Sequence, residues 1–564
     1  MRSPLALVPL FAAVVGVGAF AAAYTRPGPE PKPKVRLAVL VVFDQLRGDY
    51  PARWRPLFGP GGFARLRAGG AWFTNCHYPY GTTTTGPGHA SILSGTCPDK
   101  HGIVNNNWTE NGRDVYCATD ARYSVVRPGG PPDKAAGGTP DRLLSETVAD
   151  VLKRTHGPRA KVFGLSLKDR SAILPVGKQP DGALWFNSRF VTSTYYTDRL
   201  DRTVPDWVTR FNGSGAAERW FGRPWERSRP DVDYVHFGGP DDAAGEGGGS
   251  AQGRTFPHPT TGGLAAPGGA YYAALANSPY GNDLLLEFAK TCVTAEDLGA
   301  DDVPDLLVVS FSSNDLIGHT WGPDSQEVLD VTLRSDALVA DLLRFLDARV
   351  GAGGYALALT ADHGVGPLPQ VRGGGATRVD GDVMRANAEK YLRQTFGRGG
   401  PAPKAGSGWI EAFQPPWLYL NPRLVAASGR PRAEVARALA AHLAAHPDVA
   451  RTFTRDQLGG GFPESDLMGR RVKRSYHPDR CGDVYLVLNP FDLLSKSGGS
   501  GTTHGSPHAY DTHVPLMVYG AGIPGGVRDE AVTPQATAAI FARILGTPPP
   551  ADADFPVPTT LGVR

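Results

Sequence analysis

The sequence predicts an α/β fold with a doubly wound, mostly parallel central sheet flanked by helices. Residues 35–43, 306–311 and 355–360 form nearly continuous apolar runs, which are typical of strands buried on both faces of a parallel sheet. Two weaker strand patterns lie at 161–165 and 514–519. Helical patterns separate these strands, and they cover residues 141–155, 326–349 and 534–545. This alternation of strands and helices is the pattern of a doubly wound sheet.

The first residues have the pattern of an export signal. Arg2 precedes an apolar run from Leu5 to Ala23, which ends in small residues suitable for signal-peptidase cleavage. We interpret residues 1–23 as a signal peptide or, because the run is almost long enough to span a bilayer, as an N-terminal membrane anchor. Residues 24–34 contain several prolines and are expected to form a spacer. The protein is therefore expected to be exported, to the periplasm or the extracellular space.

Residues 35–550 are expected to form one main body with two insertions. Residues 238–269 are rich in Gly, Ala and Pro and show little periodicity, so we expect a long surface loop. The second insertion covers about 372–480 and contains a helical pattern at 434–446 and a strand pattern at 409–413. It is expected to form a small subdomain beside the sheet edge.

The composition favours small ligands as partners. The net charge is +3, and no cluster of Lys and Arg is interleaved with aromatic residues, so the sequence gives no support for a nucleic-acid partner. The five cysteines are widely spaced and form no Cys-x-x-Cys pair, which argues against a thiolate zinc site. The sequence defines no oligomeric state.

Acidic residues and histidines follow the three apolar strands. Asp44 comes directly after the first strand, Asp315 follows the second, and Asp362 follows the third. Ligands in open α/β sheets bind at the carboxyl ends of strands, and crowded buried carboxylates repel one another unless a cation offsets them. The sequence therefore predicts a metal centre at this edge of the sheet.

The histidines can be divided between two metal sites. His319 lies four residues after Asp315, a spacing that brings both side chains to one side of a helix, and His363 is adjacent to Asp362. Asp44 is placed to complete the second site. For the first site, His504 in a Gly-rich loop is the preferred third ligand, with His508 and His513 as alternatives.

The segment Thr82-Thr83-Thr84-Thr85-Gly86-Pro87 places hydroxyls at the start of a predicted helix. Pro87 suits the first helical turn, where its missing N–H costs nothing. Free backbone N–H groups and the positive end of the helix dipole favour an anion at this point. We prefer Thr85 as a nucleophile for such an anion, with Thr84 as the nearest competitor.

Taken together, these motifs resemble the alkaline phosphatase superfamily, within the type I phosphodiesterase and nucleotide pyrophosphatase group and its phosphate-irrepressible alkaline phosphatases. The resemblance covers nearly all of residues 35–545. It rests on the segments around Asp44, Thr85, His101, Asn106 to Trp108, Lys168 to Arg170, Asp315 to His319, Asp362-His363 and His504.

The resemblance implies an alkaline phosphatase-like catalytic domain over residues 35–550 with two Zn2+ ions as cofactors. One zinc ion would be held by Asp315, His319 and His504, and the other by Asp44, Asp362 and His363. Thr85 would be the nucleophile, and Asn106, Lys168 and Arg170 would contact the phosphate. We assign His89, His101 and Trp108 to the framework of the site.

The expected function is an exported two-zinc alkaline phosphatase that hydrolyses small phosphate monoesters through a phosphothreonine intermediate. Lys168 and Arg170 favour monoesters, because a phosphoryl dianion offers more charge and more free oxygens than a diester. The alternative is a phosphodiesterase or nucleotide pyrophosphatase on the same frame. A non-catalytic exported metal-binding protein is a weaker alternative, because it would have no need of Thr85 and the phosphate-contacting residues.

Overall fold

The computed structural model describes residue 1 and residues 35–130, 133–397, 408–496 and 498–562. The expected signal peptide or anchor (residues 1–23) and the spacer (24–34) therefore lie outside the described residues, apart from Met1. Among the helices of the described ranges, none is both long enough and apolar enough to cross a membrane.

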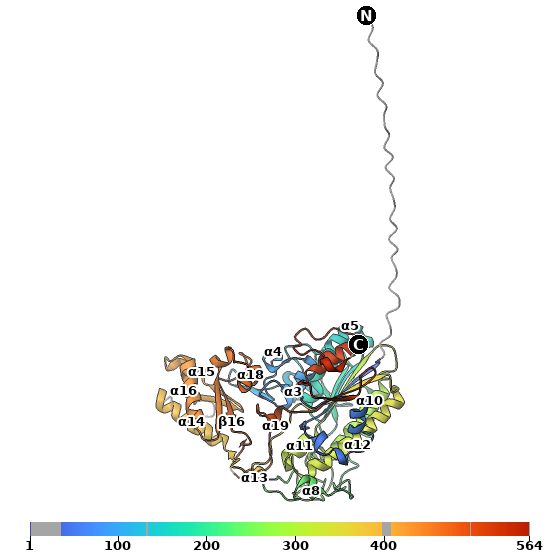
Figure 1. The fold of residues 1–564 in the computed structure, drawn as a ribbon, viewed down its shortest axis with the longest axis horizontal. Helices are drawn as coiled ribbons and strands as arrows, with labels where there is room; N and C mark the ends of the chain where they lie inside the picture. Colours follow the sequence, from blue (N-terminus) through green and yellow to red (C-terminus); the bar gives the residue numbers. More distant parts are fainter. Residues whose placement is uncertain (2–34, 131–132, 398–407, 497, 563–564) are drawn as a thin grey trace. The chain divides into compact units, whose positions relative to one another are not determined.

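The described residues contain an 11-stranded mixed sheet at their centre (Figure 1). The order across the sheet is β19 (Gly526–Arg528), β2 (Ala71–Phe73), β18 (Leu516–Gly520), β11 (Tyr355–Thr360), β1 (Leu37–Phe43), β10 (Asp305–Phe311), β7 (Val162–Ser166), β8 (Gly182–Phe186), β9 (Phe190–Ser193), β5 (Thr119–Val126) and β6 (Ala136–Gly138).

The three strongest apolar runs of the sequence are neighbours in this sheet. β1 pairs in parallel with β10 on one side and with β11 on the other, and all three strands are fully buried. Phe43 of β1 lies opposite Phe311 of β10, and Val42 lies opposite Thr360 of β11. Because parallel strands end at the same edge, the acidic residues that follow them come together there.

The sheet is parallel only from β11 to β8 and at the β19–β2 pair. The expected strand at 514–519 is β18, and it runs antiparallel to β11, with Leu516 opposite Thr360. The physical reason is the path of the chain: the loop before β18 lies at the carboxyl edge, so β18 starts where β11 ends. The outer strands β9, β5 and β6 are also antiparallel.

Helices cover both faces of the sheet, as a doubly wound fold requires (Figure 1). On one face α3 (Thr85–Ser94), α5 (Val148–His156) and α20 (Ala536–Leu545) contact one another, and on the other face α10 (Pro279–Ala295), α11 (Ser313–Trp321) and α12 (Gln326–Arg349) do so. The helix predicted at 326–349 is confirmed with the same bounds.

The helix predicted at 141–155 begins later than expected. α5 starts at Val148 because Thr147 and Asp150 form a capping box: the Thr147 hydroxyl accepts from the Asp150 N–H, and the Asp150 carboxylate accepts from the Thr147 N–H. The residues before Thr147 therefore lie outside the helix.

A second, four-stranded sheet has its own hydrophobic core. Its order is β13 (Ile410–Gln414), β14 (Trp417–Leu420), β16 (Val484–Leu488) and β15 (Val449–Thr454), and α14 (Gly381–Phe396) and α16 (Arg432–Ala444) pack with it. The sheet thus continues past residue 480. Between it and the main sheet, β12 (Arg378–Val379) pairs with β17 (Leu493–Leu494).

The Gly-rich segment lies between α8 (Tyr234–Gly238) and α9 (Gly269–Ala276) and contains no helix or strand. It is not merely a surface loop, because Glu246, Gln252 and His258 are buried. His258 contacts Glu327 of α12 at 3.0 Å, so the segment is anchored to the main body by a buried polar pair.

Candidate active site

Helix α3 positions Thr85 at the carboxyl edge of the sheet. Thr84 is its N-cap in extended conformation, Thr85 is its first residue, and Pro87 lies in its first turn, as the sequence predicts. The Thr85 hydroxyl lies 3.4 Å from His363 Nε2 and accepts a 3.3 Å hydrogen bond from Arg170 Nη2. The Thr84 hydroxyl instead donates to Asn105 Oδ1. The geometry therefore directs Thr85, and not Thr84, into the site.

The three aspartates at the strand ends are linked by Lys168 and Gln45. Lys168 Nζ donates to Asp44 Oδ2 and to Asp315 Oδ2, both at 2.6 Å. The Gln45 side chain donates to Asp315 Oδ1 at 2.8 Å, and its backbone N–H donates to Asp362 Oδ1 at 3.1 Å. All three carboxylates are buried. One cationic side chain and one amide thus hold the acidic cluster together.

The candidate histidine ligands share one arrangement. Nδ1 of His319, His363 and His504 bonds to the backbone carbonyl of Thr502, Gly364 and Thr83, respectively, at 2.7–3.0 Å. A carbonyl only accepts, so Nδ1 carries the proton and, in the neutral ring, Nε2 carries a free electron pair.

The Nε2 atoms of these three histidines face carboxylate oxygens. Asp315 Oδ1 lies 3.2 Å from His319 Nε2 and 3.5 Å from His504 Nε2. His363 Nε2 lies 3.4 Å from Asp44 Oδ1 and 3.3 Å from Asp362 Oδ2. Two groups of possible ligand atoms result: one of Asp315, His319 and His504, and one of Asp44, Asp315 and His363.

The electrostatics of the cluster fit divalent metal ions. Burial, with the Asp315 and Asp362 carboxylates beside it, raises the pKa of Asp44 well above its ordinary value. Burial lowers the pKa of His363 to about 3, which keeps the ring neutral and able to act as a ligand. Among the described residues, Asp44 Oδ1 and Asp362 Oδ2 have no hydrogen-bond partner. Buried oxygens of this kind cost free energy unless a cation compensates them.

The structure separates His504 from the two alternative histidines. His508 Nε2 bonds to the Leu488 carbonyl at 2.9 Å, and His513 Nε2 bonds to the Thr74 carbonyl at 2.9 Å. Of the three, His504 is the one whose Nε2 faces Asp315.

Asn106 and Arg170 border Thr85 on the other side. Asn106 Oδ1 accepts from the Gly86 N–H at the start of α3, so its amide nitrogen is the group that it can offer to a phosphate oxygen. Arg170 Nη1 donates to the Tyr116 hydroxyl, which in turn donates to Asp169. This chain of hydrogen bonds holds the guanidinium beside Thr85.

Of the three residues expected to form the framework of the site, His89 and His101 have hydrogen-bond partners in α3. His89 lies between the Thr85 carbonyl and the Ser310 hydroxyl, and its Nδ1 is 3.3 Å from Asp362 Oδ2. His101 bonds to Ser91 of α3. Trp108 donates to Glu110 at 2.7 Å, outside the acidic cluster, so its framework role stays a prediction.

Two residues of the site were missed by the sequence reasoning. Gln45 adjoins Asp44, and its positive φ of 69° is a backbone strain often found at functional sites, but no sequence pattern reveals that strain. Tyr116 gives no local signal either, because its role depends on its contact with Asp169 and Arg170 across the fold.

A buried Asp and His cluster next to a threonine and an arginine, at the carboxyl edge of an α/β sheet, has the chemistry of an enzyme acting on phosphoric esters. The chain belongs to the type I phosphodiesterase / nucleotide pyrophosphatase family, whose model matches residues 38–250 and 270–511. It is a hydrolase of phosphoric ester bonds, similar to the PafA-like alkaline phosphatases of this family.

Two curated relatives and one solved structure carry this similarity. The chain is 34% identical to alkaline phosphatase PafA of Elizabethkingia meningoseptica, over 87% of this chain and 88% of that protein. It is 31% identical to alkaline phosphatase PhoV of Synechococcus elongatus, over 87% and 86%. The crystal structure of wild-type alkaline phosphatase PafA matches with a TM-score of 0.85 and 32% identity, over 95% of this chain and 99% of that one.

Proposed function

We propose that this protein is an exported two-zinc alkaline phosphatase that hydrolyses small phosphate monoesters through a phosphothreonine at Thr85. The observation that carries the proposal is the common orientation of His319, His363 and His504. Each ring is fixed by a backbone carbonyl and turns its Nε2 toward a buried carboxylate, and His363 Nε2 lies next to the Thr85 hydroxyl.

Two groups of residues would hold the metal ions. Asp315, His319 and His504 would form one site. Asp44, Asp362 and His363 would form the other, since His363 Nε2 lies 3.4 Å from Asp44 Oδ1 and 3.3 Å from Asp362 Oδ2, although the tightest group of ligand atoms there joins Asp44 and His363 with Asp315. Nitrogen and oxygen ligands of this kind suit zinc. When bound, the ions would lower the pKa of the attacking hydroxyl and stabilise charge on the oxygens around phosphorus.

The chain's own residues would perform the remaining work. Thr85 Oγ would form a bond to phosphorus as the bond from phosphorus to the ester oxygen breaks, and the released oxygen would take up a proton. Water would then attack the phosphothreonine, which returns the threonine hydroxyl and frees inorganic phosphate. Arg170 and Asn106 would hold the non-bridging oxygens in place from the side of α3.

Arg170, the cation beside Thr85, would distinguish monoesters from diesters. Arg170 is fixed by Tyr116, and its Nε is buried without a hydrogen-bond partner among the described residues, so it has donors to spare for a phosphoryl dianion. A diester has one charge fewer, and one of its oxygens carries a second organic group. Arg170 therefore favours a monoesterase over the alternative phosphodiesterase.

The test compares an aryl phosphate monoester with the diester of the same aryl group. Charge-assisted contacts are worth roughly 1.5–3 kcal/mol, so Arg170→Ala and Lys168→Ala should each lower kcat/KM for the monoester by about ten- to hundredfold, and less for the diester. Metal content is measured alongside, because Lys168 also contacts Asp44 and Asp315. Equal losses on both substrates, or a wild type that prefers the diester, would replace this proposal with the phosphodiesterase.

A second experiment addresses the nucleophile. Acid quench during turnover followed by phosphopeptide mapping should find phosphate on Thr85, and Thr85→Ala should lose most turnover while still binding inorganic phosphate. Thr84→Ala is the matched control, because the Thr84 hydroxyl is bonded to Asn105. A label on Thr84 would refute the assignment.

A further inference from the structure

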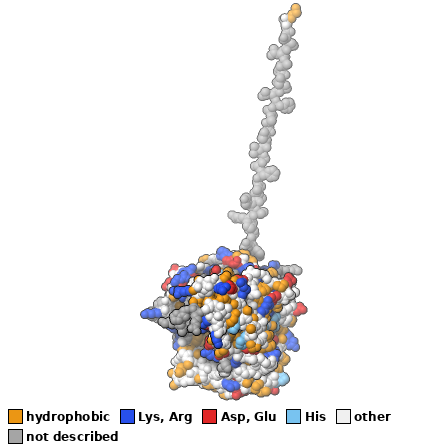
Figure 2. All heavy atoms as spheres, turned by 90° about the vertical axis from the view of Figure 1, so that its left-hand side faces the viewer, with side chains coloured by type: hydrophobic (Ala, Val, Ile, Leu, Met, Phe, Trp, Pro, Cys, Tyr) orange, Lys and Arg blue, Asp and Glu red, His pale blue; other side chains and the backbone are white. Residues whose placement is uncertain are grey.

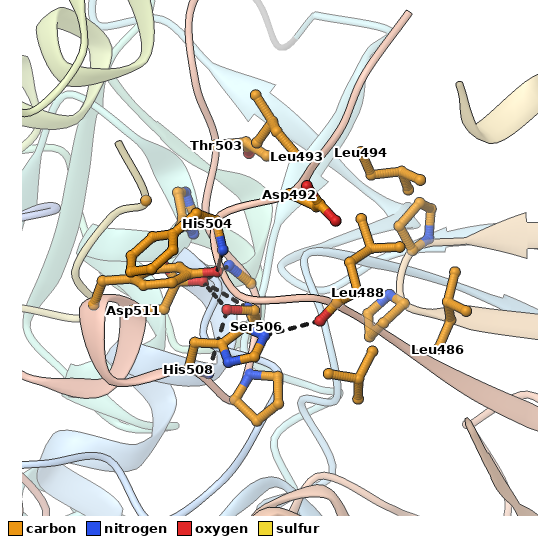
Figure 3. A pocket seen from close by; sticks show the side chains of 18 of the residues that line it. Leu486, Leu488, Asp492, Leu493, Leu494, Thr503, His504, Ser506, His508 and Asp511 are labelled. Atoms are coloured by element: carbon orange, nitrogen blue, oxygen red, sulfur yellow. Dashed lines mark hydrogen bonds between the residues drawn. The ribbon is translucent and has the colours of Figure 1, made fainter. Parts of the chain in front are cut away.

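A cavity of about 330 Å³ lies between the candidate active site and the second sheet. Thr84, Thr503 and His504 line it on the side of the active site, and Leu486, Leu488 and Leu494 line it on the other (Figure 3). Its volume is in the range of small-molecule sites, about 300–1,000 Å³. The cavity thus borders the candidate metal site at His504, which belongs to both.

Most of the side chains in the cavity wall that are free to contact a ligand are aliphatic. Several polar side chains in the wall are already bonded to the protein: Ser506 bonds to Asp511, His508 to the Leu488 carbonyl, and Asp492 to Thr377 (Figure 3). The leucines of β16 and β17 make no such bonds through their side chains. The cavity thus offers a ligand chiefly apolar surface, in which the Asp492 and Asp511 carboxylates are bonded to the protein, and it has the His504 ring in its wall.

The cavity lies on the side of the site toward which the leaving group is expected to depart. Thr85 lies beside His363, and in-line displacement at phosphorus puts the departing oxygen on the side opposite the attacking hydroxyl. His504 lies on the Asp315 side of the cluster. A group attached to the departing oxygen would therefore leave on the side of His504, which also borders the cavity.

We propose that this cavity binds the organic part of the substrate, and that the preferred substrates are monoesters of apolar alcohols, with an alkyl chain or an aromatic ring as the leaving group. The inference rests on the proposed function and adds the substrate class. Leu486, Leu488 and Leu494 determine the specificity, because they supply the apolar surface opposite His504.

The experiment measures kcat/KM for a series of n-alkyl phosphates from ethyl to hexyl. The basicity of the leaving group is nearly constant along this series, so a rise reports burial of the chain. Each buried methylene should increase kcat/KM about fourfold until the cavity is full. Binding of the matching n-alkylphosphonates, which the enzyme does not cleave, should tighten with chain length in calorimetry.

Leu488→Gln and Leu494→Gln should flatten both series while leaving ethyl phosphate hydrolysis and phosphate inhibition within about twofold of the wild type. The two variants change different strands of the cavity wall. If one of them does not fold, the other still tests the inference. Leu467→Gln is the control, because Leu467 is 56% exposed and does not line the cavity.

The outcomes separate this inference from the proposed function. No hydrolysis of the alkyl phosphates or of the aryl monoester would overturn the proposed function, whereas hydrolysis of the aryl monoester alone would overturn the leaving-group site. Hydrolysis without a rise along the series, or an unchanged slope in both variants, would overturn the leaving-group site alone.

Discussion

At the scale of single residues, the histidines of the candidate metal centre differ from the other histidines nearby in which ring nitrogen bonds to a backbone carbonyl. Three histidines bond through Nδ1 to a carbonyl and direct Nε2 at a carboxylate, whereas His508 and His513 use Nε2 to bond a carbonyl themselves. An imidazole can act as a ligand only through a nitrogen that is free of protein partners. In His319, His363 and His504 this free nitrogen is Nε2, and it faces a buried carboxylate.

The first prediction follows from this difference. His504→Ala should reduce the metal content from two ions per chain to one, because Asp315 and His319 would keep only two protein ligands. His508→Ala and His513→Ala should keep two ions. Elemental analysis of the three purified variants measures the number of metal ions per chain. A full metal content in His504→Ala would exclude His504 as a ligand.

At the scale of elements, helix α3 and the end of β11 must approach each other closely. A Cβ atom on Gly88 of α3 would lie 2.3 Å from the Asp362 carbonyl oxygen, so only glycine permits this contact. The same approach brings Thr85 next to His363. Gly88 thus affects the site because it allows α3, which carries Thr85, to lie close to Asp362.

Gly88→Ala should therefore shift α3 away from Asp362 and lower kcat/KM by about a hundredfold, since a displacement of about 1 Å of a reacting group can have such an effect. Gly213→Ala is the matched control, because Gly213 also lies in a helix, α7 (Asp206–Gly213), and a Cβ atom added to it would meet no atom within 4 Å. Activity close to that of the wild type in Gly88→Ala would show that α3 is not held in this way.

At the scale of the whole molecule, the Gly-rich segment makes stability depend on pH. Glu246 is 3% exposed, and its Oε2 accepts from the Ala243 N–H. Burial and the nearby Glu327 carboxylate raise the pKa of Glu246 from 4.5 to about 8. In the folded protein this side chain keeps its proton until the pH reaches about 8, whereas in the unfolded chain it loses the proton near pH 4.5.

The stability contributed by the proton on Glu246 is fully present below about pH 4.5 and is lost as the pH rises toward about 8. Glu246→Gln, which mimics the protonated form, should be as stable as the wild type at pH 5 and more stable at pH 9, by about 2–5 kcal/mol. Chemical unfolding at both pH values measures this, with the exposed Glu464→Gln as the control. An equal pH dependence in Glu246→Gln and the wild type would contradict the prediction.

Charged side chains are scattered over the face of the molecule that carries the second sheet (Figure 2). Figure 2 shows Lys and Arg side chains scattered among hydrophobic and uncharged groups on the face that carries the second sheet. The net charge of the whole chain is only +3. Neither observation favours a large polyanionic partner, which agrees with a small phosphate ester as the substrate.

The sequence by itself determined the features that depend on neighbouring residues. The buried strands that end near Asp44, Asp315 and Asp362, the long helix α12 and the first turn of α3 follow from apolar periodicity and from the conformational limits of proline. These patterns operate within a few residues, so they are present in the sequence whatever the rest of the chain does.

Only the tertiary structure decided what depends on contacts between distant segments. The antiparallel course of β18, the position of His504 against Thr83, the roles of Gln45 and Tyr116, and the apolar cavity beside His504 all join residues far apart in the chain. Each results from packing and hydrogen bonds that satisfy several segments at once. No local pattern encodes such a contact, because its free energy exists only when both partners are in place.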